Sequence, residues 1–179
     1  MPLRPTRALI ALLSLWTLMG LAGSLYPQVS GWWGFLGGAL GLLALFDVLV
    51  VVVFKLPLAK RTLPGRMAVG VEGEVKLRII NLSNRPLYVG VFDGIPSRCE
   101  CDVFPWRGWI KGSGYLDLNY PITLLQRGEI DFGKTHIMIT SLLGFWSRCV
   151  KIGGKGKVKV YPNYQPVLSY ALMAMAHRQ

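Results

Sequence analysis

Two cysteines are the residues whose type and spacing come nearest to a recognisable chemistry in this chain. Cys99 and Cys101 would share one face of a strand, and two thiolates are enough to begin a zinc site. A structural zinc ion normally takes four ligands. The sequence offers only two histidines, His136 and His177, and one further cysteine, Cys149. We therefore predict no metal site.

A glycine-rich segment at residues 153–157 also invites a functional interpretation. Its sequence, Gly-Gly-Lys-Gly-Lys, lacks the spacing of a phosphate-binding loop, so a hairpin turn explains it better. No nucleophile, base and acid can be grouped from the sequence with any specificity. We predict no catalytic residue, no cofactor and no enzymatic activity.

Asp47 is the one charged residue inside the apolar run 33–54. It lies about 10 Å before the end of that run if the run is helical. An ionisable group at this depth in a membrane needs a partner or water. In an antiparallel helix pair, Ser14 would lie at the matching depth. Two interpretations stay open, a structural carboxylate bonded to Ser14 or Thr17 and a functional one.

Basic residues form a second group of candidates. Lys155, Lys157 and Lys159 alternate, which places three ammonium groups on one side of a strand. One interpretation is an edge strand that lysine protects from aggregation. The other is contact with anionic lipid or nucleic acid, and a nearby membrane segment favours lipid. Three basic residues after the apolar run are further candidates for lipid contact: Lys55, Lys60 and Arg61.

The elements that position these residues begin with two apolar runs, 8–25 and 33–54. Hydrophobic residues make up 52% of the chain and charged residues 16%, which is too apolar for an average soluble domain. Each run is close to the roughly 20 residues that cross a hydrocarbon core. We predict a hairpin of two transmembrane helices, joined by an external loop at 26–32. A cleaved signal peptide and a pair of buried soluble helices are the alternatives.

Charge predicts the orientation of this hairpin. Arg4 and Arg7 precede the first run, four basic residues follow the second by residue 66, and the connecting loop has none. Because positive residues stay cytoplasmic, both termini should face the cytoplasm of a cell (inner) membrane. The N-terminus 1–7 and a basic linker 55–66 would flank the helices. An odd number of cysteines without framework spacing agrees with a reducing compartment.

Glycine spacing in the second run predicts helix packing. Gly34 with Gly38, and Gly37 with Gly41, form two overlapping pairs four residues apart. Such pairs let another backbone approach closely. The partner would be the first helix, through Gly20 and Ser24, or a second copy in a homo-oligomer.

From residue 67 onward the hydrophobic period drops to two and turn residues recur. The predicted strands are 74–79, 87–92, 99–104, 115–120, 134–140, 145–152 and 157–161. About seven short strands are typical of an immunoglobulin-like sandwich. The predicted fold class is thus a membrane α-helical hairpin followed by an all-β immunoglobulin-like sandwich at 67–163. A short helix is expected within 164–179.

The order of several short motifs resembles a bacterial and archaeal membrane-protein family called domain of unknown function fifty-eight. The matching segments are Leu45-Phe46-Asp47 and residues 60–64, 75–84, 126–129, 142–146 and 160–163. The resemblance implies a helix hairpin, a β-rich segment and then a larger domain related to the von Willebrand factor A fold. The family usually has Asp-Pro where this chain has Ser141-Leu142. We expect residues 164–179 to be the start of a C-terminal domain that this chain lacks.

The resemblance also implies a partner, a MoxR-type AAA+ ATPase active in protein assembly or maturation. We therefore expect a membrane-anchored, non-enzymatic scaffold or adaptor in the lipid bilayer. The alternative is a peripheral module that binds anionic lipid or nucleic acid through the lysine-rich strand. Trp106 and Trp109 beside Arg107 would allow base stacking, but no recognition helix or concentrated basic run supports nucleic acid. Two spans with one charge disfavour a channel or transporter built around Asp47.

Overall fold

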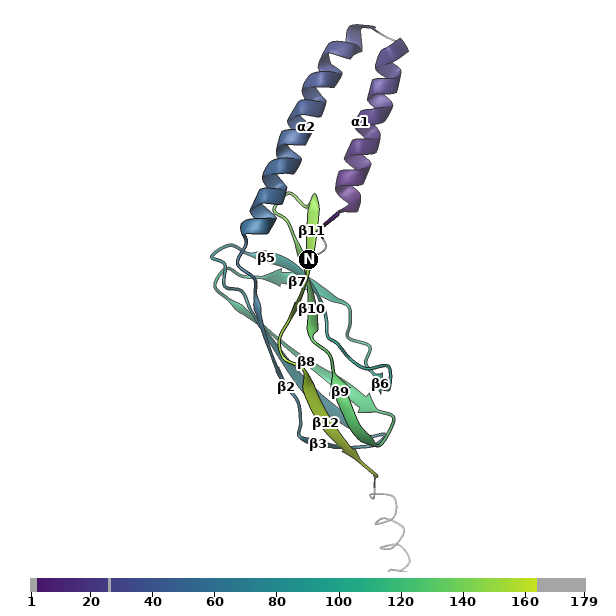
Figure 1. The fold of residues 1–179 in the computed structure, drawn as a ribbon, viewed down its shortest axis with the longest axis vertical. Coiled ribbons are helices and arrows are strands. Elements are labelled where there is room, and N and C mark those ends of the chain that lie inside the picture. The colour runs from purple at the N-terminus through teal and green to yellow at the C-terminus, as the bar shows by residue number, and fades with distance from the viewer. Residues whose placement is uncertain (1–2, 26, 164–179) are drawn as a thin grey trace, which may run out of the picture.

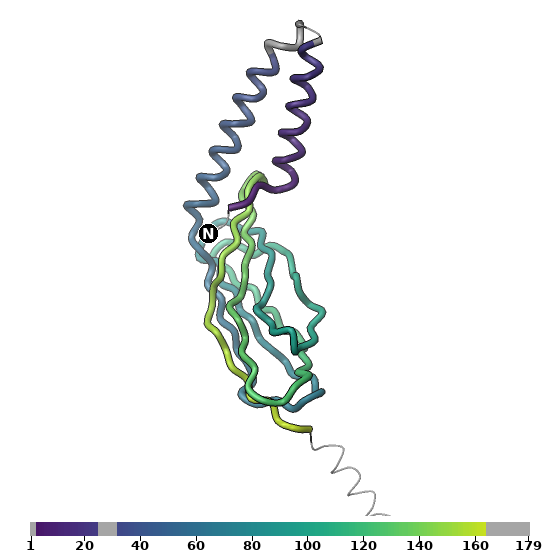
Figure 2. Tube along the Cα trace, turned by 45° about the vertical axis from the view of Figure 1, so that its right-hand side comes forward, coloured from purple at the N-terminus to yellow at the C-terminus, as the bar shows by residue number. Residues whose placement is uncertain are grey.

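The protein is long and narrow, with two helices at one end and a β-domain at the other (Figures 1 and 2). The computed structural model describes residues 3–25 and 27–163. The N-terminus lies where the helices meet the β-domain, so both ends of the helix hairpin return to the same place (Figure 1). The predicted helix within 164–179 lies outside the described residues.

The two helices are α1 (Arg7–Leu25) and α2 (Pro27–Val53). Each contains a segment long and apolar enough to cross a membrane, and only 11% of either segment is buried, unlike the core helix of a soluble protein. The predicted loop 26–32 is wrong, because α2 already begins at Pro27. Proline suits the first helical position, where its missing N–H would have no partner in any case. At about 1.5 Å per residue, α1 is about 28 Å long and α2 about 40 Å.

A pair of tryptophans fixes the register of the helices. Trp16 and Trp33 stack with ring centroids 4.6 Å apart and an interplanar angle of 6°. Each indole N–H donates a hydrogen bond of 3.1 Å to the backbone carbonyl of the other tryptophan. The rings lie over Gly37 and Gly20, where a Cβ atom would collide with an indole.

The described part of the chain contains twelve strands in three sheets, compared with the seven strands predicted. The five-stranded sheet has the order β1 (Leu3–Pro5), β11 (Trp146–Ile152), β10 (Thr135–Thr140), β5 (Leu87–Phe92), β7 (Trp106–Ile110). The four-stranded sheet has the order β2 (Leu58–Thr62), β4 (Glu72–Ile80), β8 (Tyr115–Leu124), β6 (Cys99–Glu100). The three-stranded sheet has the order β3 (Arg66–Ala68), β12 (Gly156–Tyr161), β9 (Gly128–Phe132). All pairs are antiparallel except β3 with β12.

The core lies between these sheets, and alternation along the strands builds it. In β4, for example, Val75, Leu77 and Ile79 are buried while Lys76 and Arg78 between them are exposed. Period-two alternation is the pattern of a sheet with one buried face. The predicted β-sandwich after two apolar helices is therefore confirmed.

Two segments that flank the helices belong to the sheets of the β-domain. Residues 55–66 are not a linker, because β2 pairs with β4 along its whole length. Within the predicted N-terminal segment 1–7, β1 pairs with β11. In both cases a short segment completes the edge of a sheet.

Candidate functional site

The side chain of Asp47 is the centre of the junction between α2 and the β-domain. It is 0% exposed and accepts three hydrogen bonds. One carboxylate oxygen accepts the Ser141 hydroxyl at 2.5 Å and the Phe145 backbone N–H at 3.1 Å; the other accepts the Leu143 N–H at 2.9 Å. All three donors belong to the connection between β10 and β11, which with Trp146, the first residue of β11, forms residues 141–146, the segment that we call the junction loop.

The conformation of the junction loop aims its donors at α2. Gly144 has φ of 77°, a left-handed conformation that a side chain would strain. The Ser141 hydroxyl also accepts the Trp146 N–H at 3.0 Å, which closes the turn around Asp47. The Trp146 indole N–H donates to the carbonyl of Ala44 at 2.9 Å. The loop therefore binds one face of α2 through both side-chain and backbone groups.

The same loop contacts the start of α1. The Thr6 N–H donates to the carbonyl of Phe145 at 2.8 Å, and the Thr6 hydroxyl donates to the carbonyl of Gly144 at 2.5 Å. Strand β1 continues this contact by pairing with β11. Figure 2 shows the junction loop, in green, reaching the lower end of α1. Both helices are thus bonded to one hairpin of the β-domain.

Ser14, the predicted partner of Asp47, does not contact it. The Ser14 hydroxyl donates to the carbonyl of Ile10 in its own helix at 2.9 Å, and the Thr17 hydroxyl donates to the carbonyl of Ser14 at 2.8 Å. The prediction assumed that the helices end level with each other. Asp47 lies fourteen residues beyond Trp33, whereas α1 begins only nine residues before Trp16, so Asp47 lies beyond α1 altogether.

The glycines of α2 differ in what lies beside them. A Cβ atom at Gly37 would meet Trp16, whereas one at Gly34, Gly38 or Gly41 would meet nothing within 4 Å. Gly37 therefore makes room for an indole and not for another backbone, contrary to the prediction. The other three glycines remain candidates for contact with a second copy.

Arg61 is not available for lipid contact, because it lies in a buried polar cluster of the β-domain. Its guanidinium donates to the Asp93 carboxylate at 2.8 Å, with the side chains 5% and 0% exposed. Tyr120 and Thr135 also donate to that carboxylate, at 2.5 and 2.8 Å. Burial, followed by this hydrogen bond, raises the pKa of Tyr120 above its usual value. The cluster joins β2, β8 and β10 around Asp93, which directly follows β5.

The edge-strand interpretation of the lysine-rich strand is wrong. β12 is the central strand of its sheet, between β3 and β9, so it is not an edge strand. The ammonium group of Lys157 forms ion pairs with Glu129 at 3.0 Å and with Asp131 at 3.7 Å. Lys155 is not part of the strand, because β12 begins at Gly156. Figure 1 shows β12 in the half of the domain away from the helices. This position does not favour contact of these lysines with a membrane that contains α1 and α2.

The cysteines do not gather metal-binding groups around them. Within residues 3–25 and 27–163, no three His, Cys, Asp or Glu side chains are grouped to hold a metal ion. Burial raises the pKa of the Cys99 and Cys101 thiols, which lowers the share of reactive thiolate at neutral pH. Cys99 and Cys101 do not share a strand as predicted, since β6 contains Cys99 and ends at Glu100.

No family model and no curated relative matches this chain. Among solved structures, alpha-2-macroglobulin from Salmonella, reacted with methylamine, is 18% identical with a TM-score of 0.44, covering 59% of this chain and 7% of that one. Native alpha-2-macroglobulin from Escherichia coli, from domain MG7 to the C-terminus, is 20% identical with a TM-score of 0.46, covering 61% and 17%. This chain therefore spans less than a fifth of either protein, and so distant a likeness carries no functional argument.

Proposed function

We propose that this protein is a membrane-anchored, non-enzymatic scaffold that presents its β-domain in a fixed orientation to the bilayer. The observation that supports the proposal is the junction at Asp47. Three donors from the junction loop converge on one buried carboxylate of α2, and β1 attaches the start of α1 to the same hairpin. A freely tethered domain would need neither contact.

The lengths of the helices support the proposed anchor. α1, at about 28 Å, is close to the hydrocarbon thickness of about 30 Å. On the Trp16–Trp33 register, α1 faces α2 only as far as residue 42. The remaining turns of α2 then pass from the hydrocarbon into the lipid head groups, with the junction loop beside them. In this arrangement Asp47 is surrounded by protein and is not in the hydrocarbon.

Charge and connectivity support cytoplasmic termini in a cell membrane crossed twice. Arg4, Arg7, Lys55 and Lys60 flank the helices at the end that carries the β-domain, and residues 26–32 contain no basic residue. Excess positive charge marks the cytoplasmic side. Pairing of β1 with β11 is compatible with two crossings, since both strands must then be on one side.

The proposed partner is a MoxR-type AAA+ ATPase, which the family resemblance implies. A scaffold of this kind needs an exposed domain surface at a constant distance from the membrane, and the junction would supply that constancy. The second candidate function is binding of anionic lipid or nucleic acid through the lysine-rich strand. The ion pairs of Lys157 with Glu129 and Asp131 weaken this candidate, because they offset part of the positive charge.

Affinity capture of the full-length protein from detergent-solubilised membranes tests the proposal. Mass spectrometry should find an AAA+ ATPase with the wild-type chain and with Ser14→Ala, and less of it with Asp47→Ala. Recovery of nucleic acid and no protein partner would support the second candidate. Recovery of the chain in the soluble fraction after carbonate extraction would contradict the membrane anchor itself.

A further inference from the structure

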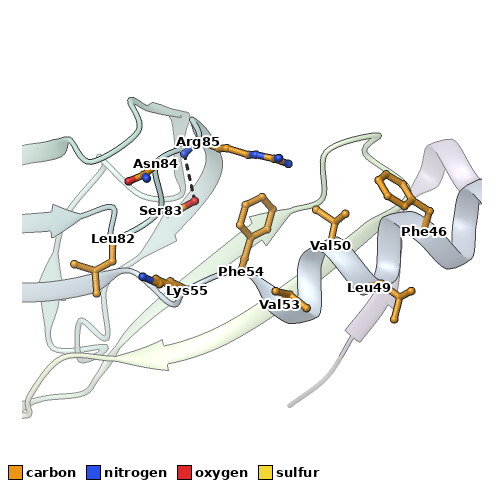
Figure 3. A pocket seen from close by; sticks show the side chains of 10 residues that line it. All are labelled: Phe46, Leu49, Val50, Val53, Phe54, Lys55, Leu82, Ser83, Asn84 and Arg85. Atoms are coloured by element: carbon orange, nitrogen blue, oxygen red, sulfur yellow. Dashed lines mark hydrogen bonds between the residues drawn. The ribbon is translucent and has the colours of Figure 1, made fainter.

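A pocket of about 540 Å³ lies between the last turns of α2 and the loop that joins β4 to β5 (Figure 3). Phe46, Leu49, Val50 and Val53 line it from the helix, and residues 82–85 line it from the loop. The pocket lies on the outer face of α2. The junction loop occupies a different face, since Asp47 and Val51 are the buried residues of these turns.

The helix side of the pocket is apolar and open. Phe46, Leu49 and Val53 are 53%, 56% and 80% exposed, and Leu42 continues the same face one turn further at 70%. Positions 42, 46, 49 and 53 share a face because they are spaced by three and four residues. A strip of this kind fits an extended hydrocarbon chain that lies along the helix.

The loop side of the pocket carries positive charge. Arg85 and Lys55 both line the pocket, and its lining contains no carboxylate. Within residues 3–25 and 27–163 the structure gives neither side chain an ion pair or a side-chain hydrogen bond. Figure 3 shows Arg85 extending from the loop toward α2, and Lys55 beside Leu82. Two cations without partners at the end of an apolar strip complement an anionic head group on an acyl chain.

We infer that the pocket binds one anionic phospholipid, with its phosphate at Arg85 and an acyl chain along Phe46, Leu49 and Val53. Lys55, which points the other way beside Leu82, adds positive charge at the same end of the pocket. The inference rests on the proposed membrane anchor, in which α2 passes from the hydrocarbon into the head groups along these turns. A basic site beside a membrane helix is a known mode of anionic lipid recognition. The bound lipid would contact both α2 and the β4–β5 loop, and so would strengthen the attachment of the domain to the bilayer surface.

Native mass spectrometry of the full-length protein in detergent tests the inference with phosphatidylglycerol and phosphatidylcholine as probes. The wild-type chain should bind phosphatidylglycerol in preference to phosphatidylcholine. Arg85→Gln with Lys55→Gln should lower phosphatidylglycerol binding by at least about tenfold, the effect of two basic residues near a surface. Lys134→Gln with Lys159→Gln removes the same charge from the other half of the domain and should leave binding unchanged. Arg85→Lys with Lys55→Arg keeps both charges and should keep the preference.

Three results would overturn the inference. The first is equal binding of the two lipids, and the second is an equal loss of phosphatidylglycerol binding in the Lys134 and Lys159 control. The third is full displacement of the lipid by millimolar inorganic phosphate, which would indicate a phosphate site. Failure of the membrane anchor is distinguished by the carbonate extraction. A chain that stays in the membrane but shows no lipid preference contradicts this inference alone.

Discussion

At the scale of single residues, the environment of Asp47 decides what its substitution costs. Removing a charge usually favours insertion of a membrane helix, but this carboxylate has partners in the β-domain. In the structure the carboxylate accepts a hydroxyl and two backbone N–H groups at a buried site. Leucine would leave all three donors without an acceptor, and each buried unpaired group costs about 1–3 kcal/mol.

The first prediction is that Asp47→Ala lowers the unfolding free energy of the full-length protein by at least about 2 kcal/mol. Asp47→Asn should cost less, because its amide oxygen still accepts hydrogen bonds. Ser14→Ala is the control and should have no effect, since the Ser14 hydroxyl bonds only to the backbone of its own helix. Thermal unfolding of the variants in detergent measures whether the loss of stability follows this order. A loss for Ser14→Ala equal to that for Asp47→Ala would contradict the structure.

The second prediction concerns the buried ion pair of Arg61 and Asp93. Removing one partner leaves the other charge buried and unpaired, at a cost of about 3–5 kcal/mol. Asp93→Asn and Arg61→Met should each destabilise the protein strongly, and the double variant should cost less than the two together. Chemical denaturation of the three variants measures this coupling. The exposed pair Arg78–Asp117 is the control, and its removal should change little because solvent screens it. Additive losses at Arg61 and Asp93 would exclude the coupling.

At the scale of elements, the packing of α1 on α2 depends on space for two indoles. Trp16 lies over Gly37 and Trp33 over Gly20, so the glycines of the hairpin accommodate rings across the interface. Gly34, Gly38 and Gly41 have open space beside them. One spacing motif in the sequence therefore contains residues with two different environments.

The third prediction compares neighbouring glycines of α2. Gly37→Leu should displace Trp16 and destabilise the hairpin by about 1–3 kcal/mol, the usual cost of overpacking. Gly38→Leu is the matched control and should leave the unfolding temperature unchanged. Circular dichroism of the stacked tryptophans and thermal unfolding report the difference. If the helix face that carries Gly34 and Gly38 joins two copies of the chain, Gly38→Leu should also lower the dimer fraction seen by light scattering. Equal destabilisation by both substitutions would show that the assigned helix faces are wrong.

At the scale of the whole molecule, the two ends of the helix hairpin meet at one strand. β1 pairs with β11 so that Arg4 lies opposite Ser147, and the Ser147 hydroxyl donates to the carbonyl of Arg4 at 3.3 Å.

The fourth prediction is that Arg4→Cys with Ser147→Cys forms an intramolecular disulfide in native membranes under mild oxidation. Arg4→Cys with Lys159→Cys should not form one, because β12 lies in the other half of the domain (Figure 1). Peptide mapping by mass spectrometry distinguishes the outcomes, and a link to residue 159 alone would refute the arrangement.

The fifth prediction is that residue 26 and the β-domain lie on opposite sides of the membrane. A reporter inserted at Tyr26 should be active outside the cytoplasm, and one fused after Asn163 should be active inside it. A reporter within residues 58–62 is unsuitable, because it would interrupt β2 in its sheet. An external signal from the fusion after Asn163 would contradict the orientation inferred from the basic residues.

Local sequence determined most of the elements. The apolar runs have no polar face and the strands β4, β5, β8, β10, β11 and β12 alternate with period two, so each could be predicted from its own residues. β1, β2, β3, β7 and β9 were missed. These five segments have at most five residues each, and β1 and β3 are placed by pairing with strands that are distant in the chain. A short segment carries too few residues to show a period, so its pairing partner decides its structure.

The junction and the pocket depended on tertiary structure in the same way. The sequence singled out Asp47 as a residue that needs a partner, but nothing local joins residue 47 to residue 141. The register of Trp16 on Trp33 decides that α2 extends past α1, and this extension exposes Asp47 to the junction loop and Phe46 to the pocket. Likewise, the sequence suggests that Arg61 and β12 are accessible. Only the packing of the sheets buries Arg61 and places β12 between β3 and β9. A hydrogen-bond requirement is a property of one residue, whereas the group that satisfies it is chosen by the packing of the whole chain.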